Sequence, residues 1–389
     1  MTQGEAGGGP RVILGIDAIC PPLTGIGRYA LSLARGLKRH PDVGQLRFYG
    51  RGGWLGEPTA LLGPHRPLNV LRRHVPFRPL ARRAYHNVMG VISRAKLAKY
   101  HQWVFHAPNY VSPDFPARIV CTVHDLSHLW MPECHPRDRV EHLLRELPRT
   151  LVHAAHVITV SNFVRDEVIA EFGLRPERVS TVYHGVDQSY HPREADALQG
   201  VLARYGFERG RYLLAVGTLE PRKNLERLLD AFRRMPAALR RAYPLVLVGD
   251  RGWHNEALLH RIDSLRAEGE LHWPGYVSER DLPSLYAGAA GFAYPSLYEG
   301  FGLPVLEAMA SGVPVLTSNR ASLPEVAGDA ALFVDPEDVA DIARSLERLL
   351  TDTDWREGAV RRGLARARAF TWEACVDRTV SIYRMVGEG

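Results

Sequence analysis

The stretch Gly291-Phe-Ala-Tyr-Pro-Ser-Leu-Tyr-Glu-Gly-Phe-Gly-Leu-Pro-Val-Leu-Glu307 decides the fold of this chain. Its first four residues form a short apolar run that is typical of a buried strand. Pro304 favours the first turn of a helix, where its missing N–H costs nothing. The stretch therefore predicts a strand, a glycine-containing loop and a helix, which is the repeating unit of an α/β sheet.

The same alternation extends on both sides of this stretch. In the C-terminal half, β-branched or apolar runs alternate with helical periodicity at a spacing that predicts right-handed βαβ units and a parallel, doubly wound sheet. The expected strands are 212–217, 245–248, 271–273, 291–294 and 313–317, and the expected helices are 225–235, 256–268, 281–287, 305–310 and 336–350.

The N-terminal half shows a second set of such units. Strands are expected at 12–17, 46–49, 119–123 and 157–160, with helices at 28–39 and from the capping residue Ser161 onward. Because 389 residues exceed what one core usually supports, we predict two Rossmann-like domains, 11–190 and 211–370, facing each other across a cleft. The polar segment 187–210 is expected to connect them, and residues 371–389 are expected to form a helix that crosses back.

Composition narrows the class of protein. Apolar residues make up 46% of the chain and charged residues 24%, which is ordinary globular usage. The first ten residues lack the charge and the apolar run of a signal peptide, and the longest apolar runs are too short to span a bilayer. Four scattered cysteines without a C-x-x-C pair are typical of reduced thiols. We therefore expect a cytoplasmic protein.

The charge of +6 is unevenly distributed. No acidic residue occurs between Glu57 and Asp114, whereas basic residues recur from Arg66 to Lys99 with aromatic residues among them. Such a stretch is either a solvated face or a surface that attracts anions. No nucleic-acid-binding module accompanies it. An anionic membrane surface on which the protein sits peripherally is therefore the preferred functional interpretation of region 66–99.

Glu299 and Glu307 are placed to flank one ligand. The loop that holds Glu299 follows a strand, so it lies at the carboxyl edge of the sheet, where open α/β folds bind ligands. The amides of Phe301, Gly302 and Leu303 come just before or at a helix N-terminus, which favours phosphate. We expect Glu299 at the sugar end of such a ligand and Glu307 at its ribose.

Two carboxylates in an E-G-F-G-L-P-x-L-E setting resemble the signature of family 4 glycosyltransferases. The resemblance covers most of the chain and is densest from Val216 to Asp335. Val216-Gly-Thr-Leu-Glu-Pro-Arg-Lys-Asn224 is similar to the donor loop of that family, and Ala308 to Val315 and Leu323 to Gly328 are similar to its C-terminal consensus. The resemblance implies the GT-B architecture, with the active site between two Rossmann-like domains.

Arg222 and Lys223 follow a strand and precede a helix, at the same edge of the sheet. A diphosphate leaving group gains charge as the glycosidic bond breaks, so a cation held there stabilises the transition state. The chain departs from the family at Thr218, where many members have an arginine. Arg222 either compensates for this missing cation in binding the donor or is simply exposed.

Two N-terminal motifs complete the candidate site. Thr24-Gly25-Ile-Gly27-Arg-Tyr resembles the glycine-rich loop that closes over the donor phosphate in the family. Taken alone it is also a weak dinucleotide fingerprint, but no acid near position 48 could hold a ribose, so a nicotinamide-dependent oxidoreductase is disfavoured. His124, in Val-His-Asp-Leu at the end of a strand, resembles the catalytic histidine of the family. The histidines show no metal-ligand spacing, and the sequence lacks an Asp-x-Asp that would suggest a metal-bound diphosphate.

The resemblance implies transfer with retention of anomeric configuration, without a metal ion or a cofactor beyond the nucleoside-diphosphate sugar. Lys223, Glu299 and His124 would be catalytic. The motifs look most like those of bacterial mannosyl- or rhamnosyltransferases of surface polysaccharide (O-antigen, lipopolysaccharide) synthesis, many of which use GDP-sugars and saccharide or lipid-linked acceptors at the inner face of the membrane. A UDP-sugar-dependent enzyme and an inactive sugar-nucleotide-binding module of the same fold are the alternatives.

Overall fold

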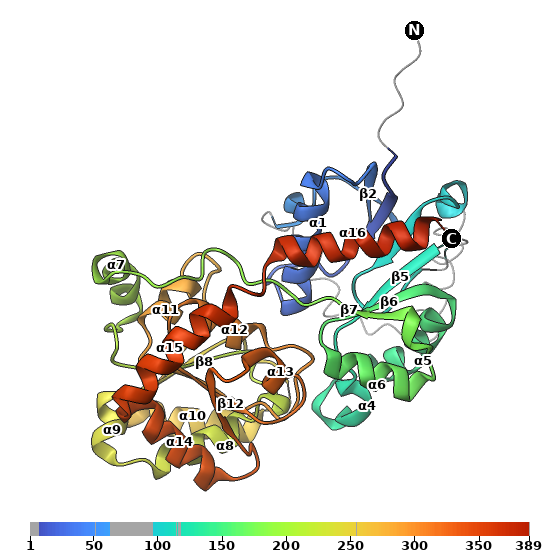
Figure 1. Cartoon of the computed structure of the whole chain (residues 1–389). Coiled ribbons are helices and arrows are strands. Elements are labelled where there is room, and N and C mark those ends of the chain that lie inside the picture. The colour runs from blue at the N-terminus through green and yellow to red at the C-terminus, as the bar shows by residue number, and fades with distance from the viewer. Residues whose placement is uncertain are drawn as a thin grey trace.

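The chain folds into two α/β domains, each built around one largely parallel sheet (Figure 1). The description rests on a computed structural model and covers residues 8–50, 52–62, 96–113, 115, 118–253 and 255–388. The predicted pair of Rossmann-like α/β domains is confirmed.

The N-terminal sheet has the strand order β3-β2-β1-β4-β5-β6-β7. All neighbouring strands pair in parallel except β2 and β3, which form an antiparallel edge. The strands are β1 (Arg11–Gly15), β2 (Gln45–Gly50), β3 (Gly53–Leu55), β4 (Val104–Ala107), β5 (Arg118–Val123), β6 (Ala154–Thr159) and β7 (Val179–Thr181). The helices around it are α1 (Gly25–Arg39), α4 (Ser127–Trp130), α5 (Arg137–His153) and α6 (Asn162–Phe172).

The C-terminal sheet has the order β10-β9-β8-β11-β12-β13 and is parallel throughout. Its strands are β8 (Leu213–Val216), β9 (Leu245–Val248), β10 (Leu271–Gly275), β11 (Gly291–Tyr294), β12 (Val315–Ser318) and β13 (Ala331–Val334). Its helices are α7 (Ala195–Tyr205), α8 (Leu225–Arg234), α9 (Ala237–Ala242), α10 (Glu256–Ala267), α11 (Leu282–Gly288), α12 (Leu303–Ala310), α13 (Leu323–Ala327), α14 (Val339–Thr351) and α15 (Thr353–Ala367). The order reverses between β8 and β11, which is the ligand-binding point of a doubly wound sheet.

Local sequence explains several helix starts. The side chain of Thr24 accepts a hydrogen bond from the Gly27 amide at the start of α1, and Ser161 accepts one from Val164 at the start of α6. Hydroxyl caps of this kind satisfy amides that the helix itself leaves free. The predicted capping role of Ser161 is confirmed.

Helix α16 (Trp372–Glu388) follows α15 but packs on the N-terminal domain, beside α1 (Figure 1). Its buried residues Val376 and Tyr383 belong to the N-terminal hydrophobic core. The hydroxyl of Tyr383 lies 2.6 Å from Nδ1 of the buried His106, which anchors the helix to β4. The chain thus crosses between the domains twice.

The two crossings lie side by side. The amide of Val186 donates to the carbonyl of Phe370 at 3.1 Å. A Cβ at Gly185 would lie 2.1 Å from the amide nitrogen of Trp372, so only glycine lets the two crossing segments approach this closely.

The structure corrects the sequence prediction at several elements. The segment 187–210, predicted to be irregular, contains α7, whose Leu198 and Leu202 are buried against the C-terminal core. The four-residue spacing of these leucines did not predict a helix, because the segment is otherwise polar and contains Gly200. Strands β4, β7 and β13 and helix α15 also went unpredicted, because their apolar runs are short or their helical face is narrow.

Candidate active site

Lys223 and Glu299 lie at the point where the C-terminal strand order reverses. Lys223 ends the short 3-10 helix η5 (Pro221–Lys223) after β8, and Glu299 lies in the loop after β11. Asn224 joins the two loops, because its side-chain amide donates to the carbonyl of Pro295 at 3.0 Å. The amide of Leu297 also donates to the carbonyl of Arg222 at 2.9 Å. Folding of the sheet therefore brings these two predicted residues together.

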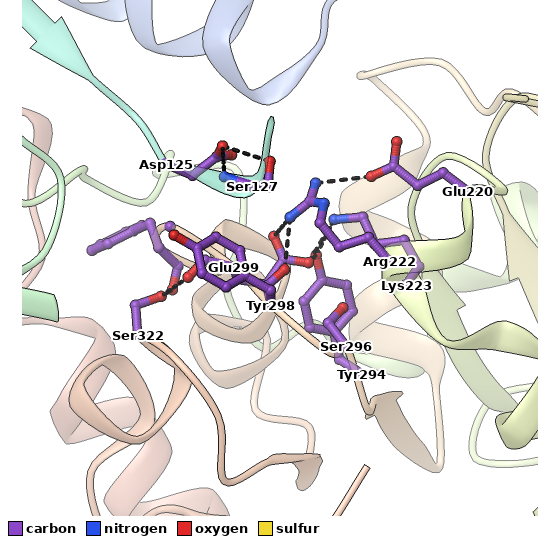
Figure 2. A network of polar contacts seen from close by, with 12 residues as sticks. Asp125, Ser127, Glu220, Arg222, Lys223, Tyr294, Ser296, Tyr298, Glu299 and Ser322 are labelled. Carbon is purple, nitrogen blue, oxygen red and sulfur yellow. Dashed lines mark hydrogen bonds and ion pairs between the residues drawn. The ribbon is translucent and has the colours of Figure 1, made fainter. Parts of the chain in front are cut away.

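The Glu299 carboxylate is the centre of a polar network (Figure 2). Its Oε1 accepts from Nζ of Lys223 at 2.7 Å and from the hydroxyl of Tyr294 at 2.9 Å. The ammonium of Lys223 also donates to the Tyr294 hydroxyl at 2.7 Å. Oε2 of Glu299 accepts from Arg222 at 2.9 Å. The hydroxyl of Ser296 also faces this carboxylate.

Glu299 is buried, with 6% of its surface exposed. Burial alone would raise the pKa of its carboxyl group, but the charges of Arg222 and then Lys223 outweigh burial and lower the pKa to about 2. The carboxylate is therefore ionised at any physiological pH and can only accept hydrogen bonds, which suits it to orient hydroxyl groups.

Arg222 is not exposed, so the alternative in which its side chain simply lies in solvent is excluded. Its side chain is 12% exposed, and it donates to Glu220 at 2.8 Å and to the carbonyl of Tyr298 at 2.8 Å as well as to Glu299. Burial would lower the pKa of Arg222, but the carboxylates of Glu299 and Glu220 raise it.

Phe301, Gly302 and Leu303 form the start of α12. Gly302 adopts φ +103°, a left-handed conformation that favours glycine, and precedes the first helical residue. The hydroxyl of Ser322 lies 2.8 Å from the carbonyl of Glu299 and 3.0 Å from that of Phe301, and so fixes the loop. Within the described ranges, the amides of residues 301–303 have no protein acceptor. They are available as donors at a helix N-terminus.

Glu307, on α12, is buried with 4% of its surface exposed. Its Oε1 accepts from Arg28 of the N-terminal domain at 3.0 Å, and Arg28 also donates to Glu279 at 2.9 Å. Burial would lower the pKa of Arg28, but Glu307 raises it above its usual value. In the described part of the chain, neither Oε2 of Glu307 nor the buried hydroxyl of Tyr286 has a hydrogen-bond partner. The hydroxyls of Tyr286 and Tyr190 both face the Glu307 carboxylate, so these groups form one buried polar cluster beside Arg28.

Gly25 and Gly27 occupy the first turn of α1 rather than a loop before it, so the predicted helix start at Arg28 is wrong. The cap by Thr24 begins the helix three residues earlier. A Cβ at Gly27 would lie 2.9 Å from the carbonyl oxygen of Ala18, whereas one at Gly25 would meet nothing within 4 Å. Gly27 therefore serves close packing, and this turn carries Arg28 toward the C-terminal domain.

His124 follows β5 and is 6% exposed. Its Nε2 lies 2.8 Å from the carbonyl oxygen of Pro108, and since a carbonyl only accepts, Nε2 carries the proton and Nδ1 of the neutral ring a lone pair. Burial lowers the pKa of His124 to about 4. The ring packs edge-on against Tyr29, with 5.1 Å between ring centroids. His124 is thus a neutral acceptor at neutral pH.

The loop of Glu299 touches the N-terminal domain directly. A Cβ at Gly300 would lie 1.8 Å from the carbonyl oxygen of His124. The hydroxyl of Ser161 donates to the carbonyl of Gly300 at 2.7 Å, and the amide of Leu126 donates to the Tyr298 hydroxyl at 3.2 Å. The structure therefore brings His124 and the loop of Glu299 together across the domain boundary.

Sequence reasoning missed Arg28, Tyr294 and the contact role of Gly300. Tyr294 ends the strand that precedes Glu299, and Arg28 lies inside the glycine-rich motif, so position alone was a usable signal for both. The contact at Gly300 has no such signal, because it depends on how the domains meet.

The described residues contain no group of three or more histidine, cysteine or acidic side chains that could hold a metal ion. None of the helices in these ranges is long and apolar enough to cross a membrane. Most of the basic stretch 66–99 lies outside the described residues. Lys96 and Lys99 are among the residues of this stretch that the structure describes.

The fold and the site define a glycosyltransferase of the GT-B class. Residues 203–365 match the model of glycosyl transferases group 1, and residues 23–190 match that of glycosyltransferase family 4. The O-antigen chain mannosyltransferase B of Escherichia coli is 38% identical over 97% of this chain and 100% of its own length. The chain therefore belongs to the family 4 glycosyltransferases.

Solved structures share the fold over nearly the whole chain. WaaG, a glycosyltransferase involved in lipopolysaccharide biosynthesis, has a TM-score of 0.72 at 17% identity and covers 96% of this chain and 99% of its own. Anabaena HepE, solved in complex with UDP and glucose, has a TM-score of 0.72 at 18% identity and covers 96% of this chain and 100% of its own. At these identities the likeness establishes the GT-B fold.

Proposed function

We propose that this glycosyltransferase moves a mannosyl group, or a 6-deoxy relative such as rhamnosyl, from a GDP-sugar to a saccharide or lipid-linked saccharide acceptor in surface polysaccharide synthesis. The observation that carries the proposal is the joined Lys223–Tyr294–Glu299 cluster at the reversal of the strand order, beside His124. The identity to an O-antigen chain mannosyltransferase over the full length supports the sugar and the pathway class.

The proposed orientation of the donor follows from the cations, amides and acceptors of the site. Lys223 and the free amides of Phe301 to Leu303 bind the diphosphate, because one is a cation and the others are donors at a helix N-terminus. The Glu299 carboxylate and Nδ1 of His124 accept hydrogen bonds from hydroxyls of the transferred sugar. The Glu307 carboxylate accepts hydrogen bonds from the ribose.

Transfer proceeds with retention and without a metal ion. The bond between the anomeric carbon and the diphosphate oxygen breaks, and the acceptor oxygen bonds to the same face of that carbon. The acceptor proton passes to the departing phosphate oxygen, so the nucleoside diphosphate itself is the base. Lys223 stabilises the negative charge that develops on this leaving group. In this route the protein orients the two reactants and needs no base of its own.

The decisive experiment compares wild-type protein with Glu299→Ala. Wild-type protein is expected to turn over GDP-mannose in preference to UDP- and ADP-sugars, and EDTA is expected to leave the rate unchanged. Glu299→Ala should lose at least ~100-fold in turnover while keeping its thermal unfolding transition. NMR of the anomeric centre in the product should show retention. Turnover at the wild-type rate by Glu299→Ala would contradict the role of Glu299 in the site. Exclusive use of UDP-sugars by the wild-type protein would show that the donor is a UDP-sugar and not a GDP-sugar.

A membrane location is the last part of the proposal. The run of basic residues from Arg66 to Lys99, without any acid, supports a peripheral position on anionic lipid at the inner face of the cytoplasmic membrane. Co-sedimentation with vesicles that contain anionic lipid, and not with neutral vesicles, is the expected result. Equal recovery with both kinds of vesicle would contradict it.

A further inference from the structure

Three of the five N–H groups of the Arg222 guanidinium donate to protein groups. Both N–H groups of its Nη1 atom have acceptors, the carbonyl of Tyr298 at 2.8 Å and Oε2 of Glu299 at 2.9 Å, and Nη2 donates to Glu220 at 2.8 Å. Its Nε is buried and has no partner among the described residues. Of the two remaining N–H groups, the one on Nε is buried, so a diphosphate could meet only the second N–H of Nη2 without displacing an ion-paired carboxylate.

Arg222 also holds the backbone of the loop that carries Glu299. Its carbonyl accepts from the amide of Leu297 at 2.9 Å, while its guanidinium donates to the carbonyl of Tyr298. One residue therefore contacts three successive positions of the loop, 297, 298 and 299. Lys223 differs, because among the described residues its ammonium donates only to the side chains of Tyr294 and Glu299 and to no backbone group of the loop.

We propose that Arg222 is a positioning residue that orients Glu299 toward the sugar, and that it is not a ligand of the diphosphate. This role rests on the proposed function of the Glu299 site. It means that Arg222 does not replace the arginine that Thr218 lacks. Lys223 and the amides at the start of α12 bind the diphosphate by themselves.

The charges around Glu299 make this role measurable by pH. The groups that face its carboxylate are Arg222 and Lys223 from η5, and Tyr294 and Ser296 from β11 and its loop. The guanidinium of Arg222 also faces Glu220 and, from the N-terminal domain, Asp125, which lie on either side of it in Figure 2. Burial raises the pKa of Asp125, and Arg222 is the main influence that lowers it. Removal of Arg222 leaves Glu299 with one cation, so its pKa must rise.

The test uses full-length Arg222→Gln and Arg222→Lys, with Lys223→Gln as the comparison for a true phosphate ligand. We expect Arg222→Gln to lower kcat by ~100-fold, as loss of alignment does, and to move the acidic limb of the kcat–pH profile to higher pH. Calorimetry should give a GDP dissociation constant within about threefold of wild type, against at least a tenfold increase for Lys223→Gln. Arg222→Lys should restore part of kcat and return the acidic limb toward its wild-type position.

The outcomes separate this role from the proposed function. Loss of GDP affinity in Arg222→Gln as large as in Lys223→Gln, with an unmoved acidic limb, would overturn the positioning role and make Arg222 a phosphate ligand. Wild-type protein that turns over no sugar nucleotide would overturn the proposed function, and the positioning role with it. If Arg222→Gln does not fold, Arg222→Lys decides, since a lysine that keeps GDP affinity while losing kcat supports positioning.

Discussion

Replacement of Gly300 by alanine should separate donor binding from transfer. The added Cβ would lie 1.8 Å from the carbonyl oxygen of His124 and 2.9 Å from Cβ of Asp125. Carbon–oxygen contacts in proteins lie at about 3.3 Å or more, so the two backbones must move apart by about 1.5 Å. Gly300 does not use the left-handed region, so alanine is otherwise compatible with its backbone.

This displacement breaks the contact that closes the site. The hydroxyl of Ser161 lies 2.7 Å from the carbonyl of Gly300, and a further ~1.5 Å takes the pair outside hydrogen-bond distance. A misplacement of about 1 Å costs roughly 100-fold in rate when reactants depend on alignment. We therefore expect Gly300→Ala to lower kcat by at least ~100-fold.

The assay is donor-dependent transfer at saturating acceptor, with GDP binding measured in parallel by calorimetry. The GDP dissociation constant should stay within about threefold of wild type, because Lys223 and Glu307, which bind GDP in the proposed function, lie outside the contact between Gly300 and His124. Gly200→Ala is the matched control: a Cβ there meets nothing within 4 Å, and alanine favours the helix by about 0.5–1 kcal/mol. Transfer by Gly300→Ala within threefold of wild type would refute the reasoning.

Two further perturbations follow from the charges of the site. Arg28→Gln should raise the donor KM about tenfold or more in steady-state kinetics, because it leaves the buried Glu307 without its ion-pair partner. Glu279→Gln removes the exposed partner of the same arginine and should change the donor KM less than threefold. Equal effects of the two substitutions would contradict a role of Glu307 in donor binding. Burial lowers the pKa of His106 to about 3 and that of His124 to about 4, so between pH 6.5 and these values the unfolded chain binds more protons than the folded one. The free energy of unfolding should therefore fall by about 2 kcal/mol per histidine as the pH is lowered from 7 to 5. Urea titrations at the two pH values would measure this change. An unchanged free energy of unfolding would show that both rings are protonated in the folded protein at pH 5.

The alternation of strands and helices was predictable because each unit is encoded locally. The apolar strand 291–294, the glycines after it and Pro304 specify one βαβ unit without reference to the rest of the chain. The position of Glu299 and Lys223 at the same sheet edge follows from that topology, because parallel strands end together.

The elements that were missed depend on tertiary contacts. Helix α7 has only two buried leucines, and its burial comes from α11, which lies far along the chain. The helical position of Gly25 depends on the cap by Thr24, which overrides the low helix propensity of glycine. The partners of Arg222 and Arg28 come from loops that meet only after both domains fold, so no spacing in the sequence specifies them.

The placement of α16 affects how the protein is made. The helix supplies Val376 and Tyr383 to the core of a domain whose sheet was synthesised before the whole C-terminal domain. The ribosome therefore releases the N-terminal sheet with an apolar face uncovered, and it stays so until α16 emerges. The N-terminal half alone should for this reason depend on chaperones or aggregate, while α16 supplied as a separate peptide should dock on it and make the half soluble.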